Sequence, residues 1–208
     1  MNDRKDHWET VYRTKRPDEV SWFQAEAELS LRLIEEFVTD RAAPIVDVGG
    51  GASVLVSQLN AAGYRDLTVL DLSAAAIAAS QARMGARGAS IHWMEADILD
   101  AELPSARYQC WHDRAAFHFL TEPAARARYV AQARQALAPG GYLLVATFAE
   151  DGPRRCSGLD VVRYSPAVLH AEFGAGFSFV GAHREEHQTP TGRLQAFTYC
   201  VCRRDRDS

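Results

Sequence analysis

The sequence predicts an α/β fold built on a mostly parallel central sheet. Short apolar runs alternate with helical patterns along most of the chain, which is typical of β-α-β units. Only a turn at residues 189–192 separates the last two apolar runs, so we expect them to form an antiparallel hairpin beside the parallel strands. With 208 residues the chain is long enough for one well-filled core, and we expect a single domain over residues 1–208.

Seven strands are predicted from apolar runs of strand length. The first five should be parallel, and the two strands of the terminal hairpin complete the sheet. In chain order the predicted strands are residues 44–48, 67–71, 90–94, 108–112, 141–147, 177–184 and 194–202.

The helices between the strands have recognisable start and stop signals. Ser73, Thr121 and Ser165 each precede a helical run and place a hydroxyl where it can cap free N–H groups. The helix predicted at residues 122–137 is followed by Pro-Gly-Gly at residues 139–141, which cannot extend it and should turn the chain into the next strand.

Composition and charge exclude several classes of protein. Hydrophobic residues make up 47% and charged residues 24%, which is ordinary for a globular protein. The net charge is −4, the isoelectric point is near 6.0, and Lys and Arg are dispersed, so no nucleic-acid partner is expected. No run approaches the roughly 18 to 20 apolar residues of a membrane span, and no apolar segment follows the charged N-terminal residues. We therefore expect a cytoplasmic protein with no membrane partner.

The four cysteines are too few and too irregularly spaced for a disulfide framework or a zinc site of paired cysteines. We expect reduced thiols and no metal site. Cys200 and Cys202 stand two apart, so they should share one face of a strand. The other two are Cys110 and Cys156.

A glycine turn follows the first predicted strand. Asp47 lies in the strand, Gly49, Gly50 and Gly51 follow it, and a helix is predicted at residues 54–60. Ligands of open α/β sheets bind at this carboxyl edge of the sheet. Glycines let a ligand approach the backbone, and the following helix offers free N–H groups. The sequence therefore predicts a ligand site over this turn.

Two acidic residues follow the next two strands. Asp71 ends the second strand, 20 positions after Gly51, where a carboxylate can accept hydrogen bonds from both hydroxyls of a ribose. Asp97 follows the third strand and can accept a hydrogen bond from the amine of adenine, with Leu72 and Ile98 packing on the ring faces. Together these residues predict a cofactor that contains adenosine.

Asp47 distinguishes between adenosine cofactors. An anionic side chain before the glycines would repel a pyrophosphate, and the turn also lacks the later glycine of the dinucleotide fingerprint. A cationic sulfonium or ammonium group would instead be attracted. The turn therefore favours S-adenosylmethionine over a nicotinamide dinucleotide.

These motifs resemble those of class I S-adenosylmethionine-dependent methyltransferases. The resemblance extends over about residues 43–150 and rests on four segments, residues 46–53, 70–73, 95–97 and 137–141. It implies a Rossmann-like sheet with the strand order 3-2-1-4-5-7-6. It also implies S-adenosylmethionine as cofactor and S-adenosylhomocysteine as product. Within the domain we expect an N-terminal helical cap at residues 1–42, a cofactor-binding core at 43–150 and an acceptor side at 151–208.

Two further segments, residues 7–23 and 62–66, are similar to small bacterial methyltransferases of undefined substrate. They are also similar to the eukaryotic group that methylates lysines on elongation factors and citrate synthase. Those lysine enzymes carry Asp-Lys-Gly after the fourth strand, whereas this chain has Asp113, Arg114 and Ala115. This departure argues against a lysine substrate and favours a small-molecule acceptor.

The loop after the fourth strand is the predicted place for acceptor chemistry. Methyl transfer is an in-line displacement at a carbon that positive sulfur already activates, so few catalytic side chains are obligatory. The candidate catalytic residues are His112, His118 and Asp113, since a histidine can serve as general base near neutral pH. Alternatively, Asp113 and Arg114 form a structural ion pair while the histidines pack or line the cofactor, so His112 is also a candidate cofactor contact.

Residues 1–42 are predicted to form two helices rich in aromatic residues. Trp8, Tyr12, Trp22 and Phe23 can either close over the sulfonium or seat the helices on the sheet. We count Trp22 among the cofactor contacts and expect Trp8 in the core.

Residues after the fifth strand should overhang the acceptor. Arg154, Arg155 and Arg163 suit an acidic small molecule, although exposed arginines are more often simply solvated. Cys156 suits a soft acceptor such as arsenite. The hairpin segment 183–187 should lie at the same place.

We therefore expect an S-adenosylmethionine-dependent methyltransferase that acts on an unidentified small molecule by in-line displacement. The alternatives are a protein lysine methyltransferase, a non-catalytic S-adenosylmethionine-binding module and, more weakly, a small nicotinamide-binding protein. The acceptor atom and the oligomeric state are left open by the sequence.

Overall fold

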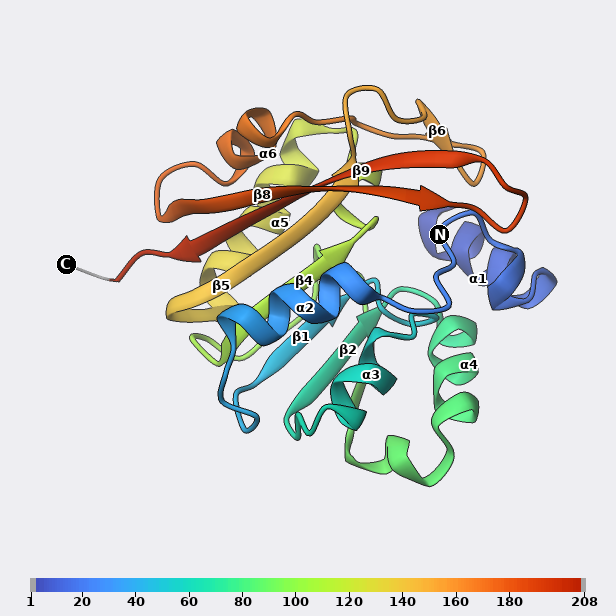
Figure 1. Cartoon of the computed structure of the whole chain (residues 1–208), viewed down its shortest axis with the longest axis horizontal. Coiled ribbons are helices and arrows are strands. Elements are labelled where there is room, and N and C mark those ends of the chain that lie inside the picture. The colour runs from blue at the N-terminus through green and yellow to red at the C-terminus, as the bar shows by residue number, and fades with distance from the viewer. Residues whose placement is uncertain (1–2, 207–208) are drawn as a thin grey trace.

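The computed structural model describes residues 3–206 and confirms the predicted α/β fold (Figure 1). The seven-stranded sheet has the order β3-β2-β1-β4-β5-β9-β8. Strands β1 to β5 are parallel, and β9 runs antiparallel to both β5 and β8. Apart from a separate short pair, β6 and β7, this is the predicted order. The bounds are β1 Ile45–Val48, β2 Leu67–Asp71, β3 His92–Glu95, β4 Tyr108–Arg114, β5 Leu137–Phe148, β8 Phe177–Gln188 and β9 Leu194–Arg204.

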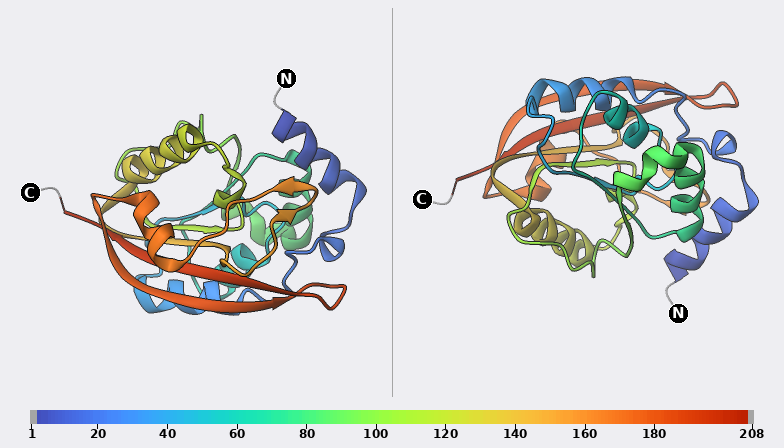
Figure 2. Two further views of the ribbon diagram at one scale, coloured as in Figure 1. Left: turned by 90° about the horizontal axis from the view of Figure 1, so that it is seen from above. Right: turned by 90° about the horizontal axis from the view of Figure 1, so that it is seen from below.

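Helices cover both faces of this sheet, as the two views of Figure 2 show. One hydrophobic core lies beneath α2 Glu28–Phe37 and α3 Leu55–Ala61, and the other beneath α5 Pro123–Ala136 and α6 Pro166–Phe173. Helix α4 Ala74–Met84 packs along β2 and β3. The remaining helical segments are α1 Asp3–Thr14 and the short 3-10 helices η1 Pro17–Glu19, η2 Gly85–Ser90 and η3 Phe117–Phe119.

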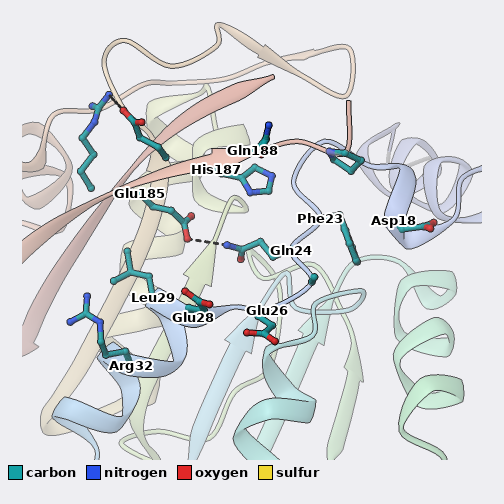
Figure 3. Close-up of a pocket in the computed structure, with 14 residues that line it drawn as sticks. Asp18, Phe23, Gln24, Glu26, Glu28, Leu29, Arg32, Glu185, His187 and Gln188 are labelled. Atoms are coloured by element: carbon teal, nitrogen blue, oxygen red, sulfur yellow. Dashed lines mark hydrogen bonds and ion pairs between the residues drawn. The ribbon is translucent and has the colours of Figure 1, made fainter. Parts of the chain in front are cut away.

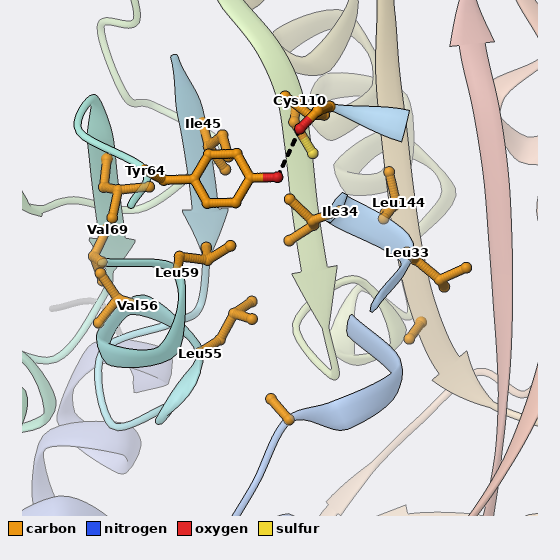
Figure 4. Packing of buried hydrophobic residues seen from close by; sticks show 14 of the residues in the cluster. Leu33, Ile34, Ile45, Leu55, Val56, Leu59, Tyr64, Val69, Cys110 and Leu144 are labelled. Carbon is orange, nitrogen blue, oxygen red and sulfur yellow. Dashed lines mark hydrogen bonds between the residues drawn. The ribbon is translucent and has the colours of Figure 1, made fainter. Parts of the chain in front are cut away.

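Figure 4 shows the first of these cores. Leu33 of α2 and Leu55 of α3 pack with Leu144 of β5, and all three are fully buried. Tyr64 is also fully buried, and its hydroxyl donates to the carbonyl of Val38 over 2.6 Å. This bond ties the segment before β2 to the end of α2.

The two predicted N-terminal helices have different positions. Helix α1 lies against α4 (Figure 1), where Glu9 accepts hydrogen bonds from the Ser73 hydroxyl over 2.7 Å and the Ala75 N–H over 3.2 Å. Helix α2 packs on the face of the sheet instead, because Ser30, Leu33 and Ile34 form a buried stripe at helical spacing. Of these two helices, only α1 therefore caps the carboxyl edge of the sheet.

Two of the three predicted helix caps are confirmed. Ser73 accepts a hydrogen bond from an N–H of the first turn of α4, and Ser165 does the same for α6. The cap at Thr121 is wrong, because α5 begins at Pro123 and Glu122 holds the N-cap position without a side-chain bond. A proline suits the first helical position and sets where the helix starts.

Two segments around β5 differ from the prediction. The predicted turn at residues 139–141 lies inside the strand, where Gly140 has a φ of +83° and the pairing with β4 shifts register. After β5, β6 Arg155–Cys156 and β7 Leu159–Asp160 form a short hairpin that was not predicted. Its two turn residues have positive φ, as two-residue hairpin loops require.

The four cysteines are free and buried, and Cys200 and Cys202 share a face as predicted, with their sulfurs 3.5 Å apart. Within residues 3–206, no helix combines the length and apolar character that a membrane crossing requires.

Candidate functional site

The glycine turn lies between β1 and α3 at the carboxyl edge of the sheet, as predicted. Gly49 has a φ of +71°, a conformation that strains other residues. A Cβ at Gly50 would lie 2.2 Å from Oδ2 of Asp47, and one at Gly51 would lie 2.7 Å from the carboxyl carbon of Asp71. The glycines therefore leave room for two carboxylates packed directly against the turn.

Asp47 is buried, and its two carboxylate oxygens have different surroundings. Oδ1 lies 2.7 Å from Nδ1 of His112, which is its neighbour in register on β4. Oδ2 has no hydrogen-bond partner among residues 3–206. A buried carboxylate oxygen without a donor is costly, so this position suits a donor that comes from a ligand.

Asp71 ends β2 and is buried as well. Its Oδ2 accepts the N–H of Gly51 over 2.9 Å, and its Oδ1 accepts the N–H of Ser73 over 2.8 Å. Each oxygen keeps a second lone pair, so the carboxylate can still accept two ribose hydroxyls. Burial raises the pKa of Asp71 to about 6, although the N–H donors oppose this shift.

Two adjoining cavities open beside these carboxylates, and Tyr12, Trp22, Gly49 and Arg114 line both. The predicted contacts that line the first cavity are Asp71, Leu72, Asp97 and Ile98, and those that line the second are Asp47, Gly50 and His112. Gly51 lines neither, because its N–H is directed at Asp71. The structure thus brings the predicted cofactor contacts together.

Asp97 has a partner that the sequence analysis missed. The guanidinium of Arg4 in α1 donates to its Oδ2 over 2.5 Å, and the N–H of Leu99 donates to its Oδ1 over 3.0 Å. Arg4 also lines the first cavity. An adenine amine at this position would share the Asp97 carboxylate with Arg4.

Aromatic side chains enclose the first cavity. Trp8 meets Trp22 edge-on at a ring-centroid distance of 5.5 Å and Phe119 at 4.9 Å, and Nε1 of Trp22 donates to the Tyr12 hydroxyl over 3.2 Å. The expectation that Trp8 belongs to the core is wrong, because α1 lies at the sheet edge and turns Trp8 to the cavity. Of these two cavities, Phe23 lines only the second.

The structure places His118 away from the two cavities. The side chain is fully buried and lines neither cavity. Its Nδ1 accepts the N–H of Phe148 over 3.2 Å. Burial lowers the pKa of His118 to about 3, so the ring stays neutral and packs between β5 and the loop after β4.

Asp113 shapes the loop after β4 and lines neither cavity. Its carboxylate accepts the Tyr129 hydroxyl over 2.6 Å and the N–H groups of Ala116 and Phe117 over 2.8 and 3.0 Å. Burial raises the pKa of Asp113 to about 6. These contacts give Asp113 a structural role in the loop.

His112 lines the second cavity, yet both of its ring nitrogens already have partners. Nδ1 contacts Asp47, and Nε2 lies 2.9 Å from the hydroxyl of Ser30 in α2. Neither nitrogen is free to take a proton directly from an acceptor. His112 is thus placed to support Asp47.

Arg114 pairs with Glu185 of β8 and not with Asp113. Its Nη2 and Nε lie 2.8 and 3.1 Å from Oε2 of Glu185, and the two side chains are only 8% and 14% exposed. The predicted ion pair with Asp113 is wrong because successive residues of a strand point to opposite faces of the sheet. Glu185 comes from the hairpin segment 183–187, which therefore reaches the site.

The acceptor-side residues after β5 have other partners. Arg155 pairs with Asp160 across the short hairpin, and Arg163 donates to a backbone carbonyl. Cys156 is buried beside Ser21, and burial raises the pKa of its thiol to about 11, which opposes the thiolate that a soft acceptor would require. Neither these residues nor Arg154 line the two cavities.

Ser30 and Tyr199 were also not predicted from the sequence, and Glu185 was expected at the site only as part of the hairpin segment 183–187. Ser30 gave a weak signal, since a polar residue stands in the apolar stripe of an amphipathic helix. Tyr199 lies in an apolar strand, and nothing in the sequence relates it to Ser30 across 169 positions.

The residues present fit S-adenosylmethionine. The unpartnered oxygen of Asp47 suits an ammonium group, the glycine turn allows close approach, and Asp71 has lone pairs left for a ribose. Comparison with known proteins agrees with this fit.

Residues 45–141 match a sequence family described as methyltransferase domain. An uncharacterized methyltransferase of Mycobacterium tuberculosis is 32% identical over 104 residues, which are 50% of this chain and 50% of that protein. The eEF1A lysine and N-terminal methyltransferase of Mus musculus is 26% identical over 109 residues, 52% of this chain and 15% of that protein. The chain thus spans half or less of the length of these curated relatives.

Among solved structures, the fold is similar to 1,6-didemethyltoxoflavin-N1-methyltransferase of Burkholderia thailandensis. That structure holds 1,6-didemethyltoxoflavin and S-adenosylhomocysteine, and it matches with a TM-score of 0.75 at 20% identity over 97% of this chain and 87% of that one. Residues 45–141 thus match a methyltransferase domain, and the sheet order is the one that the resemblance to class I S-adenosylmethionine-dependent methyltransferases implies. The matched domain and the geometry of the site both support the predicted cofactor, S-adenosylmethionine.

Proposed function

We propose that the protein transfers the methyl group of S-adenosylmethionine to a small-molecule acceptor. The observation that carries this proposal is the buried, unpartnered Oδ2 of Asp47 beside three glycines, because it suits the ammonium end of this cofactor. Asp71 offers acceptors to the ribose hydroxyls, and Asp97 offers one to the adenine amine.

The cofactor, when bound, supplies a methyl carbon that positive sulfur already activates for in-line displacement. The protein then has to align the acceptor and exclude water. Helix α1 and the rings of Trp8, Tyr12 and Trp22 enclose the first cavity and offer π faces to a cation. Because neither His112 nor His118 offers a free nitrogen to the cavities, we propose an acceptor whose nucleophilic atom is unprotonated near neutral pH.

Two observations support a small molecule as the methyl acceptor. The Burkholderia enzyme of the same fold holds a small molecule together with S-adenosylhomocysteine. In this chain, the residues that follow Asp113 are Arg114 and Ala115, and Arg114 is tied to Glu185. That ion pair occupies a position where the lysine methyltransferases have their Asp-Lys-Gly motif.

A second candidate acceptor, an amine on a protein, is favoured by an open groove (Figure 3). The groove shares Phe23 and Gln24 with the second cavity. Its charged lining is mostly acidic, with Asp18, Glu26, Glu28, Glu185 and Glu186 against Arg32 and Arg184. Such a groove would attract a lysine ammonium group.

Calorimetry with S-adenosylhomocysteine and transfer assays with methyl-labelled S-adenosylmethionine test these proposals. We expect micromolar binding, and label transfer to members of a panel of neutral heteroaromatic compounds whose ring nitrogens carry no proton. No binding refutes the proposed function. Binding without transfer to any acceptor supports a non-catalytic module.

A charge change in the groove separates the two acceptor classes. If a protein amine is the acceptor, Glu28→Gln together with Glu186→Gln should lower transfer to a lysine-rich protein and leave transfer to small molecules unchanged.

The cytoplasmic location predicted from composition also remains a proposal, which cell fractionation would test.

A further inference from the structure

A buried chain of hydrogen bonds runs from β9 to Asp47. The hydroxyl of Tyr199 lies 3.1 Å from Oγ of Ser30, and that Oγ lies 2.9 Å from Nε2 of His112. Nδ1 of His112 lies 2.7 Å from Oδ1 of Asp47. The four residues are at most 3% exposed and come from β9, α2, β4 and β1. Tertiary packing alone brings these four hydrogen-bonded side chains together.

The chemistry of the groups assigns a direction to these bonds. An ionised carboxylate can only accept, so His112 donates its Nδ1–H to Asp47. A neutral imidazole then accepts at Nε2, which requires the Ser30 hydroxyl to donate to it. Ser30 in turn accepts the hydroxyl of Tyr199. Burial raises the pKa of Tyr199 to about 12, so this hydroxyl keeps its proton.

The opposite direction of donation along these hydrogen bonds is less favourable. An imidazolium at His112 would donate from both nitrogens and turn the two hydroxyls toward Glu185. The Tyr199 hydroxyl is 3.5 Å from Oε2 of Glu185, longer than its 3.1 Å separation from Ser30. Glu185 is also already bonded to Arg114 over 2.8 Å and to Gln24 over 2.9 Å. The distances therefore favour three donors that all point toward Asp47.

We propose that Tyr199, Ser30 and His112 are positioning residues that prepare Asp47 for the ammonium group of S-adenosylmethionine. This inference rests on the proposed function. The bond from His112 fixes Oδ1, so that Oδ2 stays against Gly50 and free for a ligand. Donors in a row polarise one another, and a neutral ring leaves the carboxylate its full negative charge.

Two ligands separate this role from a general effect on the fold. S-adenosylhomocysteine carries the amino-acid end with its ammonium group. 5′-Methylthioadenosine has the same adenosine and a thioether sulfur, but it lacks the amino-acid end. Only the first ligand can bind Asp47 through an ammonium group. A positioning role therefore predicts a loss of affinity for S-adenosylhomocysteine alone.

Variants of the hydrogen-bonded residues should lose affinity for S-adenosylhomocysteine to different degrees. His112→Leu should weaken S-adenosylhomocysteine binding at least about tenfold more than methylthioadenosine binding. The reason is that the variant removes the N–H donor that holds the Asp47 carboxylate in place for the ammonium group. His112→Asn keeps an N–H near the position of Nδ1 and should restore part of the loss. Tyr199→Phe keeps the ring and should give a smaller selective loss, about threefold. Tyr64→Phe removes a buried hydroxyl outside the chain and should leave the ratio of the two affinities unchanged.

Calorimetry with both ligands decides the outcome. Equal losses for the two ligands in the His112 variants, or no selective loss in Tyr199→Phe, would overturn the inference even though the wild-type protein binds S-adenosylhomocysteine. If the wild-type protein does not bind it, the proposed function itself fails. Should His112→Leu not fold, Tyr199→Phe and Ser30→Ala carry the same test.

Discussion

The charge of Asp71 should control cofactor affinity near pH 6. Burial raises the pKa of this carboxyl to about 6, and its two oxygens already accept the N–H groups of Gly51 and Ser73. The ionised form can accept two ribose hydroxyls as well, whereas the protonated form loses its charge and one acceptor direction. Affinity should therefore fall as pH falls through 6.

The size of this effect follows from the ionised fraction. One pH unit below the pKa, about one carboxyl in eleven is ionised, so the apparent Kd for S-adenosylhomocysteine should rise about tenfold between about pH 7.5 and about pH 5. Asp71→Asn resembles the protonated form. It should bind more weakly at neutral pH and lack this pH dependence.

Calorimetric titrations across this pH range, with thermal denaturation as a check of folding, measure the effect. Asp113→Asn is the matched control, because burial also raises the pKa of Asp113 to about 6 while its carboxylate accepts the Tyr129 hydroxyl and lines neither cavity. The control should keep the tenfold change. A tenfold change that persists in Asp71→Asn would refute the reasoning.

Three further predictions concern the turn, the lid and the core. Gly50→Ala would place a Cβ 2.2 Å from Oδ2 of Asp47 and should reduce S-adenosylhomocysteine binding at least about tenfold by calorimetry, whereas Gly181→Ala, with open space around it, should not. Trp8→Ala opens the aromatic enclosure and should weaken cofactor binding several-fold without lowering the unfolding midpoint in urea, and a lowered midpoint would instead assign Trp8 to the core. Leu144→Ala leaves a cavity in a fully buried site and should lower the free energy of unfolding by about 3 kcal/mol in the same urea experiment, so a loss below about 1 kcal/mol would contradict the packing described.

Predicted and observed elements agree where the pattern is local. The sheet could be predicted because each buried strand is an apolar run, and the helices because capping serines such as Ser73 act within three residues. The prediction failed at Thr121, where Pro123 sets the helix start, and around Gly140, where pairing with β4 accommodates the glycines inside a strand.

That the predicted cofactor contacts lie close together could be predicted for the same reason. Asp47, Asp71 and Asp97 each lie in or directly after a strand, and the ends of parallel strands meet at one edge of the sheet. The place of these three aspartates in the fold therefore follows from their positions relative to the strands in the sequence. The sequence by itself determined the fold of this protein and the place of its candidate donor site.

Only the tertiary structure decided which side chains pair. Arg114 turned away from its neighbour Asp113 to bond Glu185, 71 positions along the chain, and His112 reached Ser30 across 82 positions. Such pairs depend on which face of a strand each residue occupies and on how α2 and β8 pack beside the sheet. No local pattern encodes these relations, because the free energy that selects them comes from burial and from the need to satisfy buried polar groups.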